Sequence, residues 1–438
     1  MGTTSPITIV RRWPDSVIDA DRVLLLAGVS IVALGLSSRV VKRHALSPVV
    51  LAMGAGVLVG PHALDLIDPT AVVPRGELLE QLCRIALALA VFDIALRTRP
   101  ADLRANAKRV GALLAVGMPG MWLLTSIGAG LLLDLSLPVA LLLGAALTPT
   151  DPGVAAALVS GILPDQSLPR RVRRTLQLEA AANDGLALPF VLFAGLIATM
   201  PAGEALSEWG VHAAREIGVA AIVGGLVGGA LRWLTKLADV DRLAEEDWYP
   251  LASTGVAVTV LALAHLLGGS GVFAAFIAGL VFCEGLPDGL REPIHVVHRS
   301  ITKVALSLVF LGFGLTLPVD RWWPEAGAAG VAFAVWVFLL RRAPVAIPTM
   351  LLTSTGRLSS IYIGWSGPLG VAGIYYLTFA ERYMLPEYDR LFLAGTLAIT
   401  VSVVGHALTS SSAVRIYRRR TGNETPEGEE LQVEGALP

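Results

Sequence analysis

The chain has 438 residues, of which 54% are hydrophobic and 16% are charged, and its mean hydropathy is +0.66. Soluble proteins carry about 25% charged residues, so the composition excludes an ordinary soluble domain and indicates a helical membrane protein. The net charge is −1 and no basic cluster is interleaved with aromatic residues, so we expect no nucleic-acid partner. Two isolated cysteines form neither a disulfide framework nor a metal site, and we expect no cofactor.

Apolar runs recur along the chain and predict an all-α polytopic membrane protein of about thirteen transmembrane helices. The spans are expected near residues 23–41, 47–60, 82–96, 110–133, 138–160, 174–199, 214–235, 248–267, 270–284, 299–318, 327–352, 358–380 and 388–412. Together they form one transmembrane domain, residues 23–412. Residues 1–22 are expected to be an extracytoplasmic tail, and the acidic residues 413–438 a disordered cytoplasmic tail.

Basic residues are distributed unevenly between the loops, and this sets the orientation. They follow the odd-numbered spans: Arg39, Lys42, Arg43, Arg97, Arg99, Arg104, Lys108, Arg109, Arg170, Arg171, Arg173, Arg174, Arg232, Lys236, Arg242, Arg415, Arg418, Arg419 and Arg420. The positive-inside rule places these loops and the C-terminus in the cytoplasm and the N-terminus outside, in a multi-pass protein of the cell membrane. Arg11, Arg12 and Arg22 oppose this orientation, but the alternation over the other loops outweighs them.

The fifth span contains a sequence that cannot continue as a helix. Residues 148–153 (TPTDPG) place two prolines and a glycine within about one turn, and each proline removes an amide donor. At membrane depth, such backbone is tolerated only where it is buried in protein or lines a cavity. A simple proline kink needs no charge, so the presence of Asp151 between the prolines favours a functional site.

The sixth span holds two carboxylates in a stretch that is otherwise apolar enough to cross a membrane. A charge at the bilayer centre costs at least about 2.5–3.5 kcal/mol, so Glu179 and Asp184 indicate a functional site. Glu179 and Asn183 are one helical turn apart and share a face, whereas Asp184 is turned about 100° away from Asn183. The two acids are therefore expected to have different roles.

An arginine pair, Arg341 and Arg342, ends the apolar run of the eleventh span. Either arginine is a candidate to neutralise Glu179, because a buried carboxylate is stable when it is paired with arginine. The alternative interpretation is a pair of anchors at the cytoplasmic membrane surface. If Glu179 is paired, Asp184 is left as the acid for reversible ion binding.

A second break is predicted in the twelfth span, at residues 364–370 (GWSGPLG). An odd shift in span number reverses orientation, so spans four to six and eleven to thirteen are expected to be inverted repeats with two broken crossing helices. Interrupted helices at matching positions of inverted halves are typical of a transporter's binding site. The facing half-helix ends carry opposed dipoles, which Asp151 and a cation would compensate.

Oxygen atoms around Asp184 suit a small hard cation. The expected ion- and proton-binding residues are Asp184, Asp151, Thr150 and Asn183, with Asp184 and Thr150 as ligands of a monovalent cation. A carboxylate that binds either H⁺ or a cation makes the two compete. If neither the empty nor the doubly filled site can change conformation, that competition becomes obligatory exchange.

These motifs resemble those of a known family. Residues 150–152 (TDP) in a broken helix, followed by residues 179–184 (EAAAND) in the next helix, are similar to the monovalent cation/proton antiporters of the NhaP and Na⁺/H⁺-exchanger type. Supporting similarity lies at residues 48–61, 268–280 and 310–315. The resemblance covers about residues 23–412 and implies the antiporter fold.

The family implies a homodimer of about thirteen-helix protomers with a core domain, here about residues 82–199 and 299–412, that moves like an elevator. By position, Asp184 resembles the carboxylate that binds the cation or the proton, and Glu179 resembles a structural acid paired with Arg342. The implied substrates are H⁺ and Na⁺, with Li⁺ or K⁺ as alternatives, across the lipid bilayer.

Three positions affect how the resemblance is read. Asn183 before Asp184, in place of a second aspartate, resembles the electroneutral branch. Ala180 stands where many members have a serine ligand, which affects cation choice. Leu369 stands where many members have an arginine, so either another residue supplies that cation or the pH dependence differs.

Two other readings remain open at the level of the sequence. Asp151 and Asp184 would form the acid dyad of an intramembrane aspartyl protease, although the usual sequence context of that class is absent. A non-exchanging sensor or channel built on the antiporter fold is the other alternative. We expect a transporter and not an enzyme.

Overall fold

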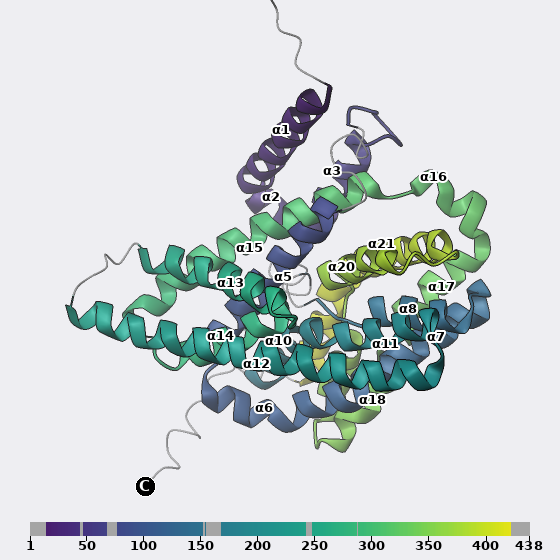
Figure 1. Cartoon of the computed structure of the whole chain (residues 1–438). Helices are drawn as coiled ribbons and strands as arrows, with labels where there is room; N and C mark the ends of the chain where they lie inside the picture. Colours follow the sequence, from purple (N-terminus) through teal and green to yellow (C-terminus); the bar gives the residue numbers. More distant parts are fainter. Residues whose placement is uncertain are drawn as a thin grey trace, which may run out of the picture.

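The computed structural model describes residues 15–43, 47–67, 77–151, 154, 168–241, 248–286 and 288–421. Throughout those ranges the regular elements are helices, which confirms the predicted all-α class. Figure 1 shows long helices packed side by side, with α1 (Asp15–Leu36) projecting from one end of the molecule. Most of the second half of the predicted fifth span and the C-terminal tail from residue 422 lie outside the described residues.

The helices were predicted well in position and less well in length. In chain order they are α1 (Asp15–Leu36), α2 (Ser38–Arg43), α3 (Pro48–Val59), α5 (Glu77–Leu96), α6 (Pro100–Ala112), η2 (Leu113–Gly117), α7 (Met118–Leu133), α8 (Leu137–Ala146), α10 (Arg170–Leu186), α11 (Leu188–Thr199), α12 (Ala202–Asp241), α13 (Trp248–Leu266), α14 (Gly271–Cys283), α15 (Asp288–Thr316), α16 (Val319–Arg321), η3 (Trp322–Ala326), α17 (Gly327–Leu340), α18 (Ala343–Leu352), α19 (Arg357–Trp365), α20 (Val371–Phe379), η4 (Ala380–Tyr383) and α21 (Tyr388–Thr421). The first helix begins within the predicted tail, and α21 continues past residue 412. Hydropathy detects only the apolar part of a helix, so the polar turns at its ends were not included in the predicted spans.

Seven helical stretches are long and apolar enough to cross a membrane. They are Pro100–Leu133, Arg170–Thr199, Ala202–Leu237, Trp248–Leu266, Arg291–Thr316, Val319–Leu352 and Tyr388–Thr421. Shorter apolar helices accompany them at Leu24–Leu36, Pro48–Val59, Leu137–Ala146 and Gly271–Cys283. The chain is therefore a multi-pass membrane protein. The count of thirteen spans stays a prediction, because half-helices fall below the length that identifies a span.

The helices pack as two groups that meet at several contacts, those of α10 among them. In one group α12, α13 and α15 pack with α14, α5 and α3; in the other α7, α8 and α11 pack together, and α17 joins α7 to α21. The helix α10 contacts α6 and α19 on one side and α5 and α14 on the other. The carboxylates of α10 therefore lie where the two groups meet.

Close packing within the first group depends on glycine. A Cβ atom on Gly56 of α3 would overlap the backbone of α15, and a Cβ atom on Gly314 of α15 would overlap the backbone of α3. Small residues allow helix backbones to approach each other in membranes, where no hydrophobic force joins helices. This contact holds α3 along the length of α15, as Figure 1 shows.

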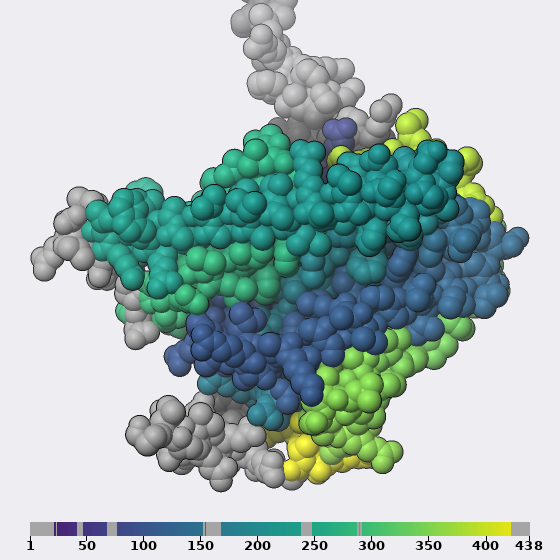
Figure 2. All heavy atoms as spheres, turned by 60° about the horizontal axis from the view of Figure 1, so that its bottom comes forward, coloured from purple at the N-terminus to yellow at the C-terminus, as the bar shows by residue number. Residues whose placement is uncertain are grey.

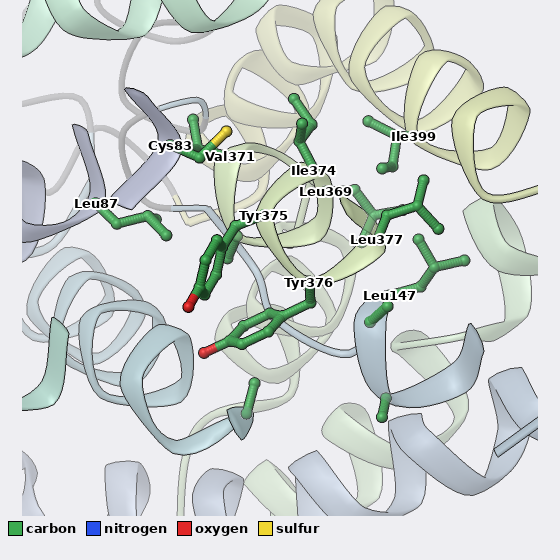
Figure 3. Close-up of a cluster of buried hydrophobic side chains, with 14 of the residues drawn as sticks. Cys83, Leu87, Leu147, Leu369, Val371, Ile374, Tyr375, Tyr376, Leu377 and Ile399 are labelled. Atoms are coloured by element: carbon green, nitrogen blue, oxygen red, sulfur yellow. The ribbon is translucent and has the colours of Figure 1, made fainter. Parts of the chain in front are cut away.

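An apolar cluster holds the second half of the broken twelfth helix in place. Figure 3 shows Ile374 and Leu377 of α20 among Leu87 of α5, Leu147 after α8 and Ile399 of α21. All of these side chains are buried. Because four elements contribute to one close-packed cluster, the short helix α20 is held in place although it has only nine residues.

Candidate functional site

Two interrupted helices meet beside α10. The helix α8 ends at Ala146, and α19 and α20 are separated by residues 366–370, so the breaks lie where proline and glycine predicted them. The two interruptions touch directly, because the backbone amide of Asp151 donates to the carbonyl of Pro368 at 3.0 Å. Half-helix ends with unpaired backbone groups are thus brought together inside the protein.

Asp151 accepts hydrogen bonds from backbone amides at the N-terminal half-helix ends of this crossing. Its Oδ1 accepts the amide of Val154 at 2.9 Å, and its Oδ2 accepts the amide of Val371, the first residue of α20, at 2.7 Å. Gly370 allows the approach, since a Cβ atom there would overlap the Asp151 carboxylate. A carboxylate at helix N-termini is favourable for the helix dipole, so Asp151 is part of the scaffold of the crossing.

Arg341 donates hydrogen bonds to backbone carbonyls at the C-terminal half-helix ends of the same crossing. Its guanidinium donates to four backbone carbonyls at the ends of α8 and α19: Leu147 (2.9 Å), Thr148 (2.8 Å), Pro149 (3.3 Å) and Gly367. A cation at helix C-termini compensates the dipole there. Arg341 therefore supplies from α17–α18 the positive charge that Leu369 of the twelfth helix does not supply.

Glu179 of α10 is paired with Arg342 in a buried, two-pronged ion pair. The Oε1 and Oε2 atoms of Glu179 lie 3.1 Å and 3.0 Å from Nη1 and Nη2 of Arg342. The Nε atom of Arg342 donates to the carbonyl of Ile363 in α19 at 3.1 Å, so the pair joins α10 of the first predicted repeat to α19 of the second. Arg341 and Arg342 are only 2% and 4% exposed, so the membrane-surface anchor interpretation is wrong.

Asn183 links the Glu179 pair to the first break. Its Nδ2 donates to Glu179 Oε1 at 2.8 Å and to Thr150 Oγ1 at 2.9 Å, and its Oδ1 accepts the Thr150 amide at 3.2 Å. The shared helix face of Glu179 and Asn183, predicted from their spacing, is confirmed by the first of these bonds. The side chain of Asn183 thus holds the TDP segment against α10.

Asp184 differs from every other acid of this region. It is fully buried, and neither carboxylate oxygen has a hydrogen-bond partner among the described residues. Its backbone is nevertheless fixed, because the Asp184 carbonyl accepts the Tyr376 hydroxyl at 2.6 Å and the next carbonyl, of Gly185, accepts Ser270 Oγ at 3.1 Å. An unpaired carboxylate away from water is costly unless it binds a proton or has a cation beside it.

The surroundings of Asp184 suit a monovalent ion. Across the described ranges, no group of three or more His, Cys, Asp or Glu side chains is placed to hold a metal ion. The Asp184 carboxylate offers one negative charge and hard oxygen ligands, which match the charge of Na⁺, Li⁺, K⁺ or H⁺.

The sequence prediction missed three residues that shape the site: Arg341, Tyr376 and Ser270. Arg341 was considered as a partner of Glu179 or as an anchor at the membrane surface, and not as a donor to the half-helix ends. Tyr376 carries a signal in its position, because the Tyr375-Tyr376 pair follows the second break within α20, and Figure 3 shows both hydroxyls pointing out of the apolar cluster. Ser270 is the N-cap of α14, whose side chain also bonds to the Phe273 amide, and no local pattern joins it to α10.

The Glu179–Arg342 pair is expected to be a major source of stability for this region. Glu179→Gln keeps the shape and the bond from Asn183 but leaves Arg342 as a buried unpaired charge, at a cost of about 3–5 kcal/mol. We expect a large fall in the thermal unfolding midpoint in detergent. A double change, Glu179→Gln with Arg342→Met, should recover part of the loss.

The control for this prediction is the pair Arg321–Glu325, whose side chains are 40% and 45% exposed. Glu325→Gln makes the same chemical change in a solvated ion pair, which contributes about 1 kcal/mol at most. Equal falls for Glu179→Gln and Glu325→Gln, or simple additivity in the double variant, would contradict the predicted coupling.

Comparisons with known proteins agree with this geometry. A family model described as "Sodium/hydrogen exchanger, transmembrane" matches residues 26–415. The chain is 26% identical to a Na⁺/H⁺ antiporter of Schizosaccharomyces pombe, over 84% of the chain and 82% of that protein. It is 28% identical to the K⁺/H⁺ antiporter NhaP2 of Shewanella oneidensis, over 90% of the chain and 66% of that longer protein. The structure of the sodium proton antiporter MjNhaP1 from Methanocaldococcus jannaschii superposes with a TM-score of 0.70 at 19% identity, covering 90% of this chain and 98% of the other.

Proposed function

Because the chain belongs to the sodium/hydrogen exchanger family, we propose that it is a secondary antiporter that exchanges a monovalent cation for H⁺. The observation that carries the proposal is Asp184, fully buried beside two broken helices, with both carboxylate oxygens left without a partner in the described part of the chain. Na⁺ is the first cation to test, and Li⁺ and K⁺ follow, since the relatives named above include Na⁺/H⁺ and K⁺/H⁺ antiporters.

In this proposal one carboxylate does the exchange and the other polar groups hold it. Asp184 binds either H⁺ or the cation, with the Thr150 hydroxyl as a further ligand and Asn183 keeping Thr150 in position. Asp151 and Arg341 hold the half-helix ends, and Glu179 with Arg342 holds α10 against the second predicted repeat. Because neither substrate binds without displacing the other, movement of the loaded site couples the two gradients.

The remaining expectations concern the whole molecule. We propose a homodimer in the cell membrane, with the N-terminus outside and the C-terminus in the cytoplasm. We also propose elevator-like alternating access of the core domain, about residues 82–199 and 299–412, which contains α10, the two broken helices and α17–α18. The packing of α10 on α14, which lies outside this core, supports the proposal, since a moving group needs its ion site at the boundary with the static one.

The aspartyl protease alternative is not favoured by the geometry. A catalytic dyad shares a proton between two carboxyl groups. Both oxygens of Asp151 accept backbone amides, and the carboxylate of Asp184 forms no hydrogen bond with it or with any other described residue. The comparisons also favour transport.

Exchange is tested with the purified protein in liposomes that contain a pH-sensitive dye and carry an imposed pH gradient. Adding Na⁺, Li⁺ or K⁺ outside should dissipate the gradient, with saturation in cation concentration. Choline, a larger organic cation that is not among the proposed substrates, should have no effect. A gradient that collapses equally with choline indicates a channel or leak, and a gradient that persists with all three cations refutes antiport.

The exchange is expected to be electroneutral. One carboxylate, with Asn183 where an electrogenic exchanger would carry a second acid, binds one H⁺ or one monovalent cation, so the loaded site carries the same net charge either way. A membrane potential acts at about 2.3 kcal/mol per charge per 100 mV and then has no net charge to act on. The structural task of Asp151 at the helix ends supports a single exchanging acid.

Voltage dependence measures this directly. Na⁺-driven H⁺ movement in liposomes should keep its rate when valinomycin and a K⁺ gradient impose a potential, provided that K⁺ is not itself transported. A rate that increases with one polarity and decreases with the other would mean that more than one proton moves per cation.

A further inference from the structure

A cavity rich in arginine lies away from the Asp184 site, where the start of α6 faces the ends of α12 and α14 and the start of α15. Its volume is about 480 Å³, and its charged lining residues are Arg99, Arg104, Arg232, Arg291 and Glu284. Four guanidinium groups and one carboxylate give an excess of three positive charges. No step of the proposed exchange uses these residues, so we call this the arginine cavity and ask what it binds.

The guanidinium groups of the arginine cavity differ in how many hydrogen-bond acceptors they already contact within the protein. Arg232 donates to Glu284 at 2.8 Å, and Arg291 donates to the carbonyls of Cys283 and Leu286 at 3.1 Å and 3.0 Å. Among the residues that the structure describes, the side chains of Arg99 and Arg104 have no acidic or carbonyl partner. The wall formed by α6 therefore presents positive charge that is not neutralised within the described ranges.

The backbone adds to this positive potential. The helix α6 begins at Pro100 with Arg99 at its N-cap, and no side chain caps its first amides. Helix N-termini carry a partial positive charge and bind phosphate groups. Asp102, the acid of this first turn, lies toward Arg170 and Arg174, at 3.1 Å and 3.6 Å, so its charge is matched by two arginines.

The helices that line the cavity carry exposed apolar side chains. Trp233, next to Arg232, is 62% exposed, and Leu103, next to Arg104, is also exposed. Tryptophan, leucine and arginine in this arrangement are typical of the membrane–water interface, where basic pockets between helices hold anionic headgroups. On the face shown in Figure 2, the blue atoms of α6 border the green and teal atoms of the group that contains α12 and α14–α15.

We propose that the arginine cavity binds the phosphate group of an anionic phospholipid. The bound phosphate joins α6, which packs on α10, to the ends of α12, α14 and α15 across the boundary between the two helix groups. A free phosphate compound offers the same chemistry, and the lipid is favoured because α6 and α12, which line the cavity, belong to helical stretches that are apolar enough to cross a membrane. This inference concerns binding and does not depend on the proposed exchange.

The test measures the thermal unfolding midpoint of the full chain in a neutral detergent. The probes are dioleoyl phosphatidic acid, dioleoyl phosphatidylcholine with the same acyl chains, and inorganic phosphate. We expect phosphatidic acid to raise the midpoint in a saturable manner and phosphatidylcholine to leave it unchanged, because binding to the folded state stabilises it by mass action. Inorganic phosphate at millimolar concentration should have a much smaller effect.

Three variants distinguish this cavity from the rest of the basic surface. Arg99→Gln and Arg104→Gln each change an exposed side chain and should weaken the apparent affinity for phosphatidic acid by about tenfold. Glu284→Gln should strengthen it, because the carboxylate competes with the phosphate for Arg232. Lys108→Gln removes one positive charge from the exposed surface of the same helix, outside the cavity, and should bind like the unchanged protein.

Some outcomes overturn the proposal. Equal stabilisation of the unchanged protein, Arg99→Gln and Arg104→Gln by phosphatidic acid would show that the lipid binds elsewhere, and no stabilisation by any probe would exclude the site. Inorganic phosphate that matches the lipid, with the same loss in both variants, would overturn the lipid as the ligand. The increase expected for Glu284→Gln separates all of these from damage to the fold, which only weakens binding.

Discussion

Asp184→Asn is expected to abolish cation-driven proton movement and to leave the fold intact. The amide has nearly the size of the carboxyl group, but it cannot exchange a proton for a cation and carries no charge for Na⁺ to bind. Because both Asp184 oxygens are unpartnered within the described structure, the substitution breaks no hydrogen bond. In the liposome dye assay, the rate should fall to the background of protein-free vesicles.

We also expect Asp184→Asn to change the free energy of unfolding in the opposite direction to most substitutions of buried residues. Burial of a charged, unpaired carboxylate is unfavourable, so removing the charge should leave the unfolding midpoint unchanged or raise it. In the unchanged protein, Na⁺ should raise the midpoint by mass action, and in Asp184→Asn this increase should disappear. Binding and transport then fail together while the fold persists.

Asp389→Asn is the matched control, because it makes the same chemical change at a side chain that is 77% exposed. It should keep both exchange and the stabilisation by Na⁺. Residual saturable exchange in Asp184→Asn would assign the ion site to another residue, and loss of exchange in both variants would point to a defect unrelated to the site.

The features that the sequence could predict are those with a local cause. Prolines and glycines break helices wherever they stand, so the interruptions at residues 147–151 and 366–370 follow from the chain alone. The bond between Asn183 and Glu179 follows from helix geometry, because residues one turn apart share a face. An unpaired acid within an apolar helix likewise indicates function from hydropathy alone.

The features that could not be predicted depend on contacts between distant segments. Charge alone allows either arginine of the pair to meet Glu179, and adjacent helical residues point about 100° apart. The structure interrupts the helix between α17 and α18 at Arg341 and Arg342, so that one guanidinium faces α10 and the other faces the crossing. This division of tasks is a tertiary property, and no spacing rule predicts it.

The arginine pair also accounts for a departure from the family pattern. The resemblance to the antiporters leads us to expect an arginine within the twelfth helix, where this chain has Leu369, whose side chain belongs to the apolar cluster of Figure 3. The half-helix ends need a positive charge whatever its origin. Arg341 reaches the same ends from the neighbouring helix, so the missing arginine is replaced and not lost.

Arg341→Met is therefore expected to be the most destabilising single substitution at the crossing. Four carbonyl groups at the ends of α8 and α19 lose their donor in a buried region, and the loss should be of the order of 3–5 kcal/mol. We expect low yield, a strongly lowered unfolding midpoint in detergent, and little exchange from the protein that is recovered.

Arg341→Lys tests whether the half-helix ends require the planar guanidinium group with its several donors or only a positive charge. A lysine keeps the charge, but its compact ammonium cannot donate to both half-helices at once as the planar guanidinium does. The variant should fold with an intermediate midpoint and a reduced rate of exchange, because one half-helix end is left without its donor. Arg357→Met, at an exposed arginine that begins α19, should behave like the unchanged protein. If Arg341→Met matches Arg357→Met in stability, the half-helix ends do not depend on Arg341, and the replacement of the family's missing arginine must be sought elsewhere.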